Sequence, residues 1–396
     1  MFSGRMVIQT GGQIFHLYKG KLTKCDLSCF TGEGKQQMEE KKTERLLFWD
    51  ILKGIGIVSI VFGHSQNLGI LIRAVYYYHL AIFFFVSGYL FNEERYGDRP
   101  FEFFARRLKN MWTPYVCYGG LFVLLHNFLS ENRLFPSELY GRKDMLYALV
   151  DTFLLHCSEG PSGAMWFVPA MLAVGAVFSA LLWLCRNYLP STARPWALAA
   201  FCGLAGFAGV VLNRKGIRLD YHIQTALLVV PIYYGGYLLR ARKVEVEKYV
   251  AWPGAIFCGV LLSYFLLTTD ESVELSVNVI PRGINFYVIS AAGIYLCCFA
   301  AKCLQRHPKA GGAAALLGKY SFDIMALHFL VFKAVDWIYG LLINDPIENR
   351  VRFPHSYDEL HLLYLVLGVV IPVVLAIAAR KAIHRAGHDV RSHFQI

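Results

Sequence analysis

The sequence has little charge and few of the signals that mark soluble or secreted proteins. Only 17% of its 396 residues are charged, whereas soluble proteins average about 25%. The N-terminal segment has no apolar core of a signal peptide, and the ten cysteines include no Cys-x-x-Cys redox motif. These absences argue against an ordinary soluble protein and a thiol redox enzyme. The eight cysteines that lie in or near apolar runs are best interpreted as small buried hydrophobes.

What the chain has instead is a series of apolar runs, with 56% hydrophobic residues. A helix that spans a bilayer needs ~20 mostly apolar residues. We predict an all-α integral membrane protein with about ten transmembrane helices in one bundle. The predicted spans are 51–72, 76–92, 112–130, 164–185, 196–213, 221–239, 250–268, 284–304, 316–343 and 360–379. A shorter amphipathic stretch, 144–156, is expected to lie at the interface or to re-enter the membrane.

The net charge of +11 is explained by topology rather than by nucleic acid binding. When the N-terminus is placed inside, most Lys and Arg residues fall in the segments on the inner side of the membrane, which is the usual bias of membrane proteins. We therefore predict cytoplasmic termini, a multi-pass protein of the inner (plasma) membrane, and no nucleic acid partner.

The domain boundaries follow from the same pattern. We expect a cytoplasmic tail at 1–42, a membrane domain at 43–385 and a second cytoplasmic tail at 386–396. Residues 1–37 are polar, and the sequence from Met38 leads directly into the first span. We hypothesise that translation starts at Met38; a short cytoplasmic tail is the alternative.

Two ionisable residues lie on the first apolar run, Lys53 and His64. Ionisable groups are costly inside a bilayer and indicate a functional site. On an α-helix, residues eleven positions apart share nearly one face and lie about 16 Å apart. Two other interpretations stay open, because Lys53 can extend its amine to the interface and His64 can bond a neighbouring helix.

Further polar residues gather at the two predicted membrane surfaces. Arg106, Arg107 and Lys109 are expected on the cytoplasmic side, either as topology determinants or as phosphate contacts. The residues expected on the outer side are His79, Trp166, Asp220, His222, Arg282 and Asn285. Two of these, His79 and Trp166, are also typical of interfacial belts. His328 is interpreted as an interhelical hydrogen-bonding group rather than a second catalyst, and no spacing of ligands predicts a metal site.

Five blocks of the chain, in order, resemble those of the membrane acyltransferase-3 family, and especially its fucose 4-O-acetylase-like branch. The first-helix signature is a basic residue, ten residues and a histidine, here Lys53 and His64. The second-helix block resembles 78–91, where Ala81 replaces the usual proline. The remaining blocks are 104–115, 165–170 and 318–328.

This resemblance implies ten helices, a cytoplasmic acyl-CoA donor, and transfer of an acyl group, usually acetyl, to a hydroxyl of a cell-surface sugar or lipid-linked glycan. It implies that His64 is the catalytic histidine and that Lys53 belongs to the donor site. Acetyl-CoA would be a co-substrate, and no bound cofactor is expected.

A base must take the hydroxyl proton in such a transfer, and histidine suits that role. We assign the donor site to Asp50, Lys53, Arg106, Arg107 and Lys109, and the acceptor site to the outer-side residues named above. Ser65, Ser87 or backbone N–H groups are candidates for stabilising the oxyanion. The alternative function is a transporter or flippase for a polysaccharide precursor, with Lys53 and His64 as gate or proton-relay groups.

Overall fold

The computed structural model describes residues 6–10, 13–18, 21–25, 32–65, 69–269, 272–281 and 283–393. The chain divides into two compact units, Met1–Trp49 and Asp50–Ile396. Unit 1 holds three short strands, β1 (Met6–Thr10), β2 (Gln13–Tyr18) and β3 (Lys21–Cys25). They pair antiparallel in the order β1-β2-β3. The described part of unit 2 is helical, apart from one bridge between Glu274 and Val279, as the sequence predicts.

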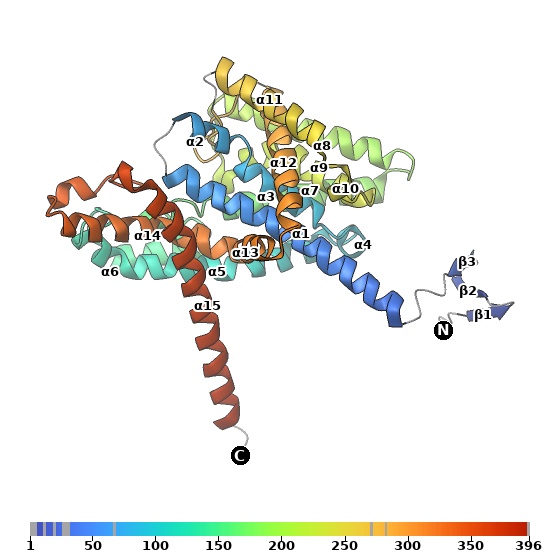
Figure 1. Ribbon diagram of the computed structural model, residues 1–396, viewed down its shortest axis with the longest axis horizontal. Helices are drawn as coiled ribbons and strands as arrows, with labels where there is room; N and C mark the ends of the chain where they lie inside the picture. Colours follow the sequence, from blue (N-terminus) through green and yellow to red (C-terminus); the bar gives the residue numbers. More distant parts are fainter. Residues whose placement is uncertain are drawn as a thin grey trace. The chain divides into compact units, whose positions relative to one another are not determined.

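The helices are connected mostly by short loops, and Figure 1 shows their arrangement. They are α1 (Gly32–Ser65), α2 (Gly69–Tyr76), α3 (His79–Tyr89), α4 (Glu93–Tyr96), α5 (Pro100–Glu131), α6 (Arg142–Phe153), α7 (Phe167–Tyr188), α8 (Arg194–Arg214), α9 (Ile223–Ala241), α10 (Val246–Tyr249), α11 (Trp252–Thr268), α12 (Asn285–Gln305), α13 (Pro308–Lys319), α14 (Ser321–Leu342) and α15 (His361–His393).

Each predicted span coincides with one or more of these helices. Among the described residues, seven helical segments are long and apolar enough to cross a membrane. They are Leu46–Ser65, Gly69–Tyr89, Phe167–Tyr188, Arg194–Arg214, Asn285–Gln305, Ser321–Leu342 and Asp358–Ile383. The helix α11 is apolar but shorter. A membrane protein built of apolar helices is therefore confirmed, while the count of ten spans and the cytoplasmic termini stay predictions.

Two predicted spans are divided in the structure, and their boundaries need correction. The span 51–72 is not one helix, because α1 ends at Ser65 and α2 begins at Gly69. Ser65, the last residue of α1, donates its hydroxyl to the Phe62 carbonyl oxygen, and such a local bond competes with a continuing helix. Residues 66–68 lie outside the described part of the chain. The span 316–343 is divided at Tyr320, between α13 and α14, where glycine and serine lower the helix propensity.

Glycines allow a close helix crossing in unit 2. A Cβ at Gly54 of α1 would overlap the carbonyl oxygen of Ala314, and one at Gly318 would overlap that of Asp50. Small residues at a crossing let two backbones approach closely in a membrane. This contact fixes α1 against α13 beside Lys53, so that the first-helix residues have a defined position.

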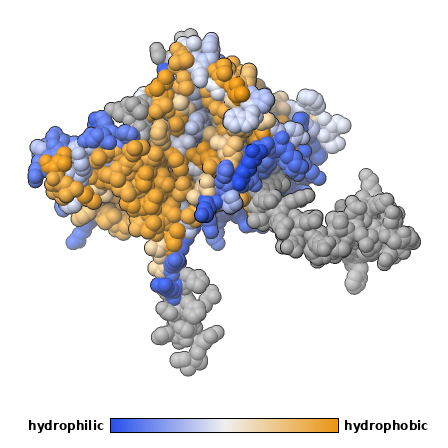
Figure 2. All heavy atoms as spheres, in the orientation of Figure 1, coloured by the Kyte–Doolittle hydropathy of each residue, from blue (hydrophilic) through white to orange (hydrophobic). Residues whose placement is uncertain are grey.

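The helix pairs α3–α9, α7–α9, α8–α9, α11–α12 and α14–α15 pack side by side. Buried aromatic rings fill the centre of unit 2, including Phe84, Phe178 and Tyr233. The outer faces are also apolar. On α15, residues four apart form an exposed stripe of Leu362, Val366, Val370 and Val374. Figure 2 shows an apolar expanse over this part of the surface, as expected of helices that face lipid rather than water.

Candidate active site

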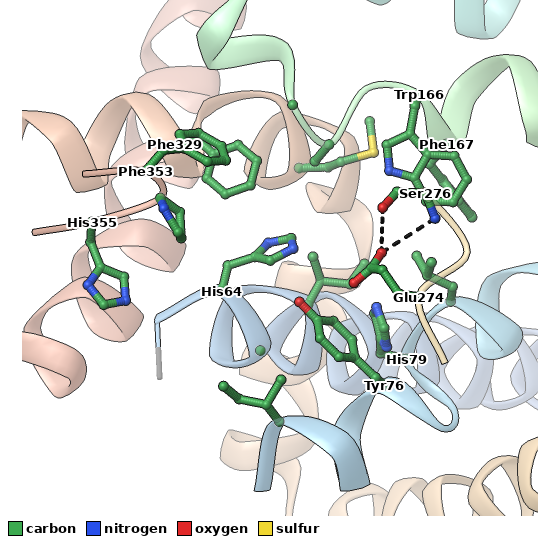
Figure 3. A pocket seen from close by; sticks show the side chains of 18 of the residues that line it. His64, Tyr76, His79, Trp166, Phe167, Glu274, Ser276, Phe329, Phe353 and His355 are labelled. Atoms are coloured by element: carbon green, nitrogen blue, oxygen red, sulfur yellow. Dashed lines mark hydrogen bonds between the residues drawn. The ribbon is translucent and has the colours of Figure 1, made fainter. Parts of the chain in front are cut away.

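His64 opens on a cavity of about 430 Å³, here called the His64 cavity. Its walls come from α1, α2, α3 and α14, from the segment before α7, and from the loops that contain Glu274 and Arg352. Figure 3 shows that His64 lies between two groups of side chains, one around Glu274 and the other around Phe353 and His355. The end of α1 therefore places its histidine in the lining of this cavity.

A second histidine supports His64 from α14. His64 Nδ1 lies 3.0 Å from Nε2 of His328, and the two rings are nearly parallel, with centroids 5.2 Å apart. His328 is completely buried. Its Nδ1 lies 3.0 Å from the carbonyl oxygen of Ile324 and 2.9 Å from that of Met325. Phe329 packs against both imidazoles, so the pair is held firmly from one side.

The second wall of the cavity carries an acid and several aromatic groups. Glu274 accepts hydrogen bonds from the Ser276 hydroxyl and backbone, at 2.5 Å and 3.4 Å. Nδ1 of His79 lies 3.1 Å from the carbonyl oxygen of Val75. This carbonyl can only accept, so the other nitrogen of a neutral His79 is an acceptor. This wall offers a carboxylate and an imidazole to a polar ligand.

The third wall is the loop that precedes α15. Arg352, Phe353, His355 and Asp358 of this loop line the cavity, and Arg352 forms an ion pair with Asp358. Burial lowers the pKa of His355, against the opposing effect of nearby carboxylates. The loop presents paired charges rather than a free cation.

A buried ion pair holds this loop against α14. Lys333 Nζ lies 2.6 Å from Asp336 Oδ2 and donates to the carbonyl oxygens of Arg350 and Arg352 at 2.5 Å and 3.0 Å. Asp336 Oδ1 in turn accepts from the backbone N–H of Ser356 at 3.1 Å. The ion pair thus bonds the backbone on both sides of Phe353.

A smaller cavity of about 200 Å³ lies along α1 from His64, here called the Lys53 cavity. It is lined by Lys53, Ser87 and Arg107 and otherwise mainly by apolar side chains. Arg107 Nη2 donates to Ser87 Oγ at 2.5 Å. Lys53 Nζ lies 2.6 Å from Asp50 Oδ1.

The two cavities share part of their walls. Ile60, Phe167 and Met325 line both of them. These three residues therefore form a wall that the two cavities have in common.

The remaining predicted site residues lie elsewhere. Arg106, Lys109 and Asp220 are exposed and line neither cavity, so their roles stay predictions. Asn285 begins α12 outside both linings, and Arg282 lies outside the described residues.

Two predicted acceptor residues meet each other, although only one lines the cavity. The ring of His222 packs against Trp166 with centroids 5.0 Å apart, and Trp166 lines the His64 cavity. Ser65 donates to the carbonyl oxygen of Phe62 in its own helix at 3.2 Å. Its hydroxyl is thus already engaged, and Ser65 is not part of the lining.

Sequence reasoning missed Tyr76, Glu274, Arg352 and His355. Three of these lie in loops, where no helical or strand period relates them to the histidine. The only available signal was weak: charged residues and histidines cluster in the polar stretches between apolar runs, where binding residues are common.

Comparison with known proteins identifies the family. A family model described as an acyltransferase domain, of the acyltransferase-3 type, matches residues 46–381. The chain belongs to the membrane acyltransferase-3 family. It is a membrane acyltransferase, as its motifs suggest. No curated protein and no solved structure matches the chain, and the fucose 4-O-acetylase-like branch stays a prediction.

Proposed function

We propose that this membrane acyltransferase moves an acetyl group from cytoplasmic acetyl-CoA, or another acyl-CoA, to a hydroxyl of a cell-surface sugar or lipid-linked glycan. The proposed location is the inner (plasma) membrane. One observation carries most of the argument. The cavity that His64 lines shares three residues with the Lys53 cavity, and His64 and Lys53 lie on the same helix, α1.

The Lys53 cavity suits the donor. Its two cations match the phosphates of CoA, since charge-assisted bonds to phosphate are strong. Arg107 Nε has no hydrogen-bond partner among the described residues, and Asp50 orients the Lys53 amine. Arg106 and Lys109 are exposed on the same helix as Arg107. We assign them a longer-range attraction for the anionic donor.

The distance between the two ends fits an extended acyl arm. Lys53 and His64 are separated by about 16 Å along α1, a span that suits the pantetheine chain of CoA. Ile60 and Met325, which have flexible apolar side chains, line both cavities. We propose that these side chains move aside when the acyl arm reaches toward His64.

The reaction then needs one base. His64 takes the proton of the acceptor hydroxyl while that oxygen attacks the thioester carbonyl, and a tetrahedral intermediate forms. When the intermediate collapses, the C–S bond breaks, and the imidazolium of His64 returns the proton to the leaving sulfur. General base catalysis of this kind contributes about 10²–10⁴-fold in rate.

The His64 cavity suits a sugar acceptor. Trp166 and Phe353 offer aromatic faces, while Glu274 and His79 offer hydrogen-bonding groups to hydroxyls. Binding sites typically combine an apolar lining with a few placed polar groups. His222 would act through Trp166, against which it packs, while Asp220, Arg282 and Asn285 would contact more distant parts of the acceptor.

The test is acyl transfer in membranes. Membranes that contain the wild-type chain, His64→Ala or His307→Ala receive acetyl-CoA labelled in the acetyl group, and the label in surface and lipid-linked glycans is measured. His307 is an exposed histidine at the start of α13, outside both cavity linings. We expect label with the wild type and His307→Ala, and a loss of at least about 100-fold with His64→Ala.

Two outcomes would contradict the proposal. Transfer by a folded His64→Ala protein at the wild-type rate would show that His64 is not the base. A wild-type chain that changes glycan export without placing label on any glycan would favour the transporter or flippase, with Lys53 and His64 as gate or proton-relay groups.

A further inference from the structure

His328 is bound in a way that determines where its hydrogen lies. Its Nδ1 faces two backbone carbonyl oxygens, those of Ile324 at 3.0 Å and Met325 at 2.9 Å. A carbonyl oxygen can only accept a hydrogen bond, so Nδ1 of His328 must carry the hydrogen. In a neutral imidazole the other nitrogen, Nε2, is then an acceptor.

The position of the hydrogen on His328 determines which nitrogen of His64 carries a hydrogen. His328 Nε2 lies 3.0 Å from Nδ1 of His64. One of these two nitrogens must donate, and Nε2 of a neutral His328 has no hydrogen to give. Nδ1 of His64 therefore carries the hydrogen, and Nε2 of His64 keeps the lone pair that a base requires.

The opposite arrangement needs a charged His328. An imidazolium there could donate to His64 Nδ1, but it would be a fully buried cation beside the rings of Phe329 and Phe332. No carboxylate contacts either imidazole in the described part of the chain. Burying a charge without a partner is costly, so the neutral pair is favoured.

We propose that His328 is a positioning residue, which orients His64 and fixes its tautomer so that Nε2 is the proton acceptor in acyl transfer. This inference rests on the proposed function and assigns a role that the sequence does not give to His328. The chain of bonds runs from the α14 carbonyls through Nδ1–H and Nε2 of His328 to Nδ1–H of His64.

The proton balance leaves His328 neutral throughout. When His64 Nε2 takes the hydroxyl proton, His64 becomes an imidazolium that still donates from Nδ1 to His328. The same proton then leaves from Nε2 to the sulfur of CoA. His328 thus occupies the place that a carboxylate holds in serine hydrolase triads, where the third group fixes the tautomer and orientation of the histidine, but it contributes no negative charge.

Substitutions separate this role from simple packing. In His328→Phe the ring is kept, but no atom can accept from His64. In His328→Gln the side-chain oxygen can accept from His64 and the amide N–H can donate to the backbone carbonyls. Purified wild type, His328→Phe and His328→Gln would be compared by kcat, by KM for acetyl-CoA, and by melting temperature.

We expect His328→Phe to lower kcat at least about 100-fold, because orienting partners typically contribute 10–100-fold or more. The KM for acetyl-CoA should change less than about threefold. We expect His328→Gln to recover at least about tenfold of the lost kcat. A folded His328→Phe protein with wild-type kcat would overturn the proposal. So would a folded His328→Gln protein that is as slow as His328→Phe.

A spectroscopic measurement on the wild type tests the tautomer directly and does not depend on the activity of any variant. Nitrogen-15 NMR of histidine-labelled protein in nanodiscs distinguishes protonated from unprotonated ring nitrogens, and His64→Gln identifies the His64 signals. We expect a protonated Nδ1 and an unprotonated Nε2 on His64; the reverse tautomer would refute the inference. If the wild type transfers no acyl group, the proposed function fails by itself, whatever tautomer the spectrum shows.

Discussion

The His64 cavity and the Lys53 cavity differ in chemistry although one helix, α1, contributes to both. The His64 cavity gathers imidazoles, carboxylates and aromatic rings from several helices and loops. The Lys53 cavity is about half as large and mainly apolar, with two cations. Only the group Ile60, Phe167 and Met325 belongs to both.

The difference suggests a division of labour along α1. A site for hydroxyls needs many hydrogen-bonding partners, whereas an anionic donor with a long uncharged arm needs cations followed by an apolar passage. A helix places residues at both ends with fixed spacing, so that one element can set the distance between binding and chemistry. The following predictions test whether the two cavities play these separate parts.

The largest effect is expected from a pair of lysines that look alike in sequence. Lys333 pairs with Asp336, and Lys53 with Asp50, each across three residues and at 2.6 Å. The Lys333 side chain is 2% exposed and the Lys53 side chain 25%. Removing one partner of a buried pair costs about 3–5 kcal/mol, whereas an exposed pair contributes about 0–1 kcal/mol.

We therefore expect Lys333→Met to lower the free energy of unfolding by about 3–5 kcal/mol and Lys53→Met by less than about 1 kcal/mol, measured by denaturant titration in detergent. Lys53→Met should instead weaken acetyl-CoA use. Similar stability losses for the two variants would show that the buried pair does not hold the loop at the His64 cavity.

The next largest effect concerns the shared wall. Met325→Trp places a large rigid ring where the two cavities meet, while Met325→Leu keeps the volume and is tolerated in most cores. We expect Met325→Trp to reduce acyl transfer at least about 100-fold, equivalent to about 2.7 kcal/mol, with binding of CoA retained. Transfer at the wild-type rate by Met325→Trp would mean that the acyl group does not pass this point.

A smaller effect is expected at two adjacent arginines of α5. Arg107 lines the Lys53 cavity, whereas Arg106 is exposed. We expect Arg107→Ala to raise KM for acetyl-CoA about tenfold, close to 1.4 kcal/mol, and Arg106→Ala to raise it less than about threefold. A larger effect of Arg106→Ala on KM would contradict the assignment of the Lys53 cavity to the donor.

The smallest effect is a dependence of stability on pH at His355. Burial lowers the pKa of His355, so the unfolded chain binds a proton more readily than the folded chain. The contribution of neutral His355 to the free energy of unfolding is fully present above the ordinary histidine pKa of about 6.5. It is lost as the pH falls toward the lower pKa of the folded state. When the pH is lowered from 7.5 to 5.5, the melting temperature of His355→Gln should therefore fall less than that of the wild type. Equal losses would contradict this assignment.

The helical part of the site was predictable from sequence because the helical period fixes relations within one element. The spacing of Lys53 and His64 predicted that they share one face of a helix, and motif resemblance added His79 and Trp166. That Lys53 and His64 line two cavities with a common wall is known only from the structure. By the same geometry, only one face of α5 points inward: successive residues turn by about 100°. This explains why Arg107 reaches a cavity while Arg106 and Lys109 do not.

The loop part of the site was not predictable. Glu274 and Arg352 are distant from α1 in sequence, and loops follow no period that would relate them to His64. His328 was recognised as a hydrogen-bonding group, but its partner depended on how α14 packs against α1, which apolar patterns alone do not determine. The family match identifies the acyltransferase; the tertiary contacts identify which side chains meet.

The most direct test of this account separates donor binding from chemistry in one protein. Purified His64→Ala would be assayed for equilibrium binding of labelled acetyl-CoA and for transfer of the label to glycan acceptors. We predict binding within about threefold of the wild type and a transfer rate reduced at least about 100-fold. Transfer that persists in this variant, or a complete loss of donor binding, would contradict a base at one end of α1 and a donor site at the other.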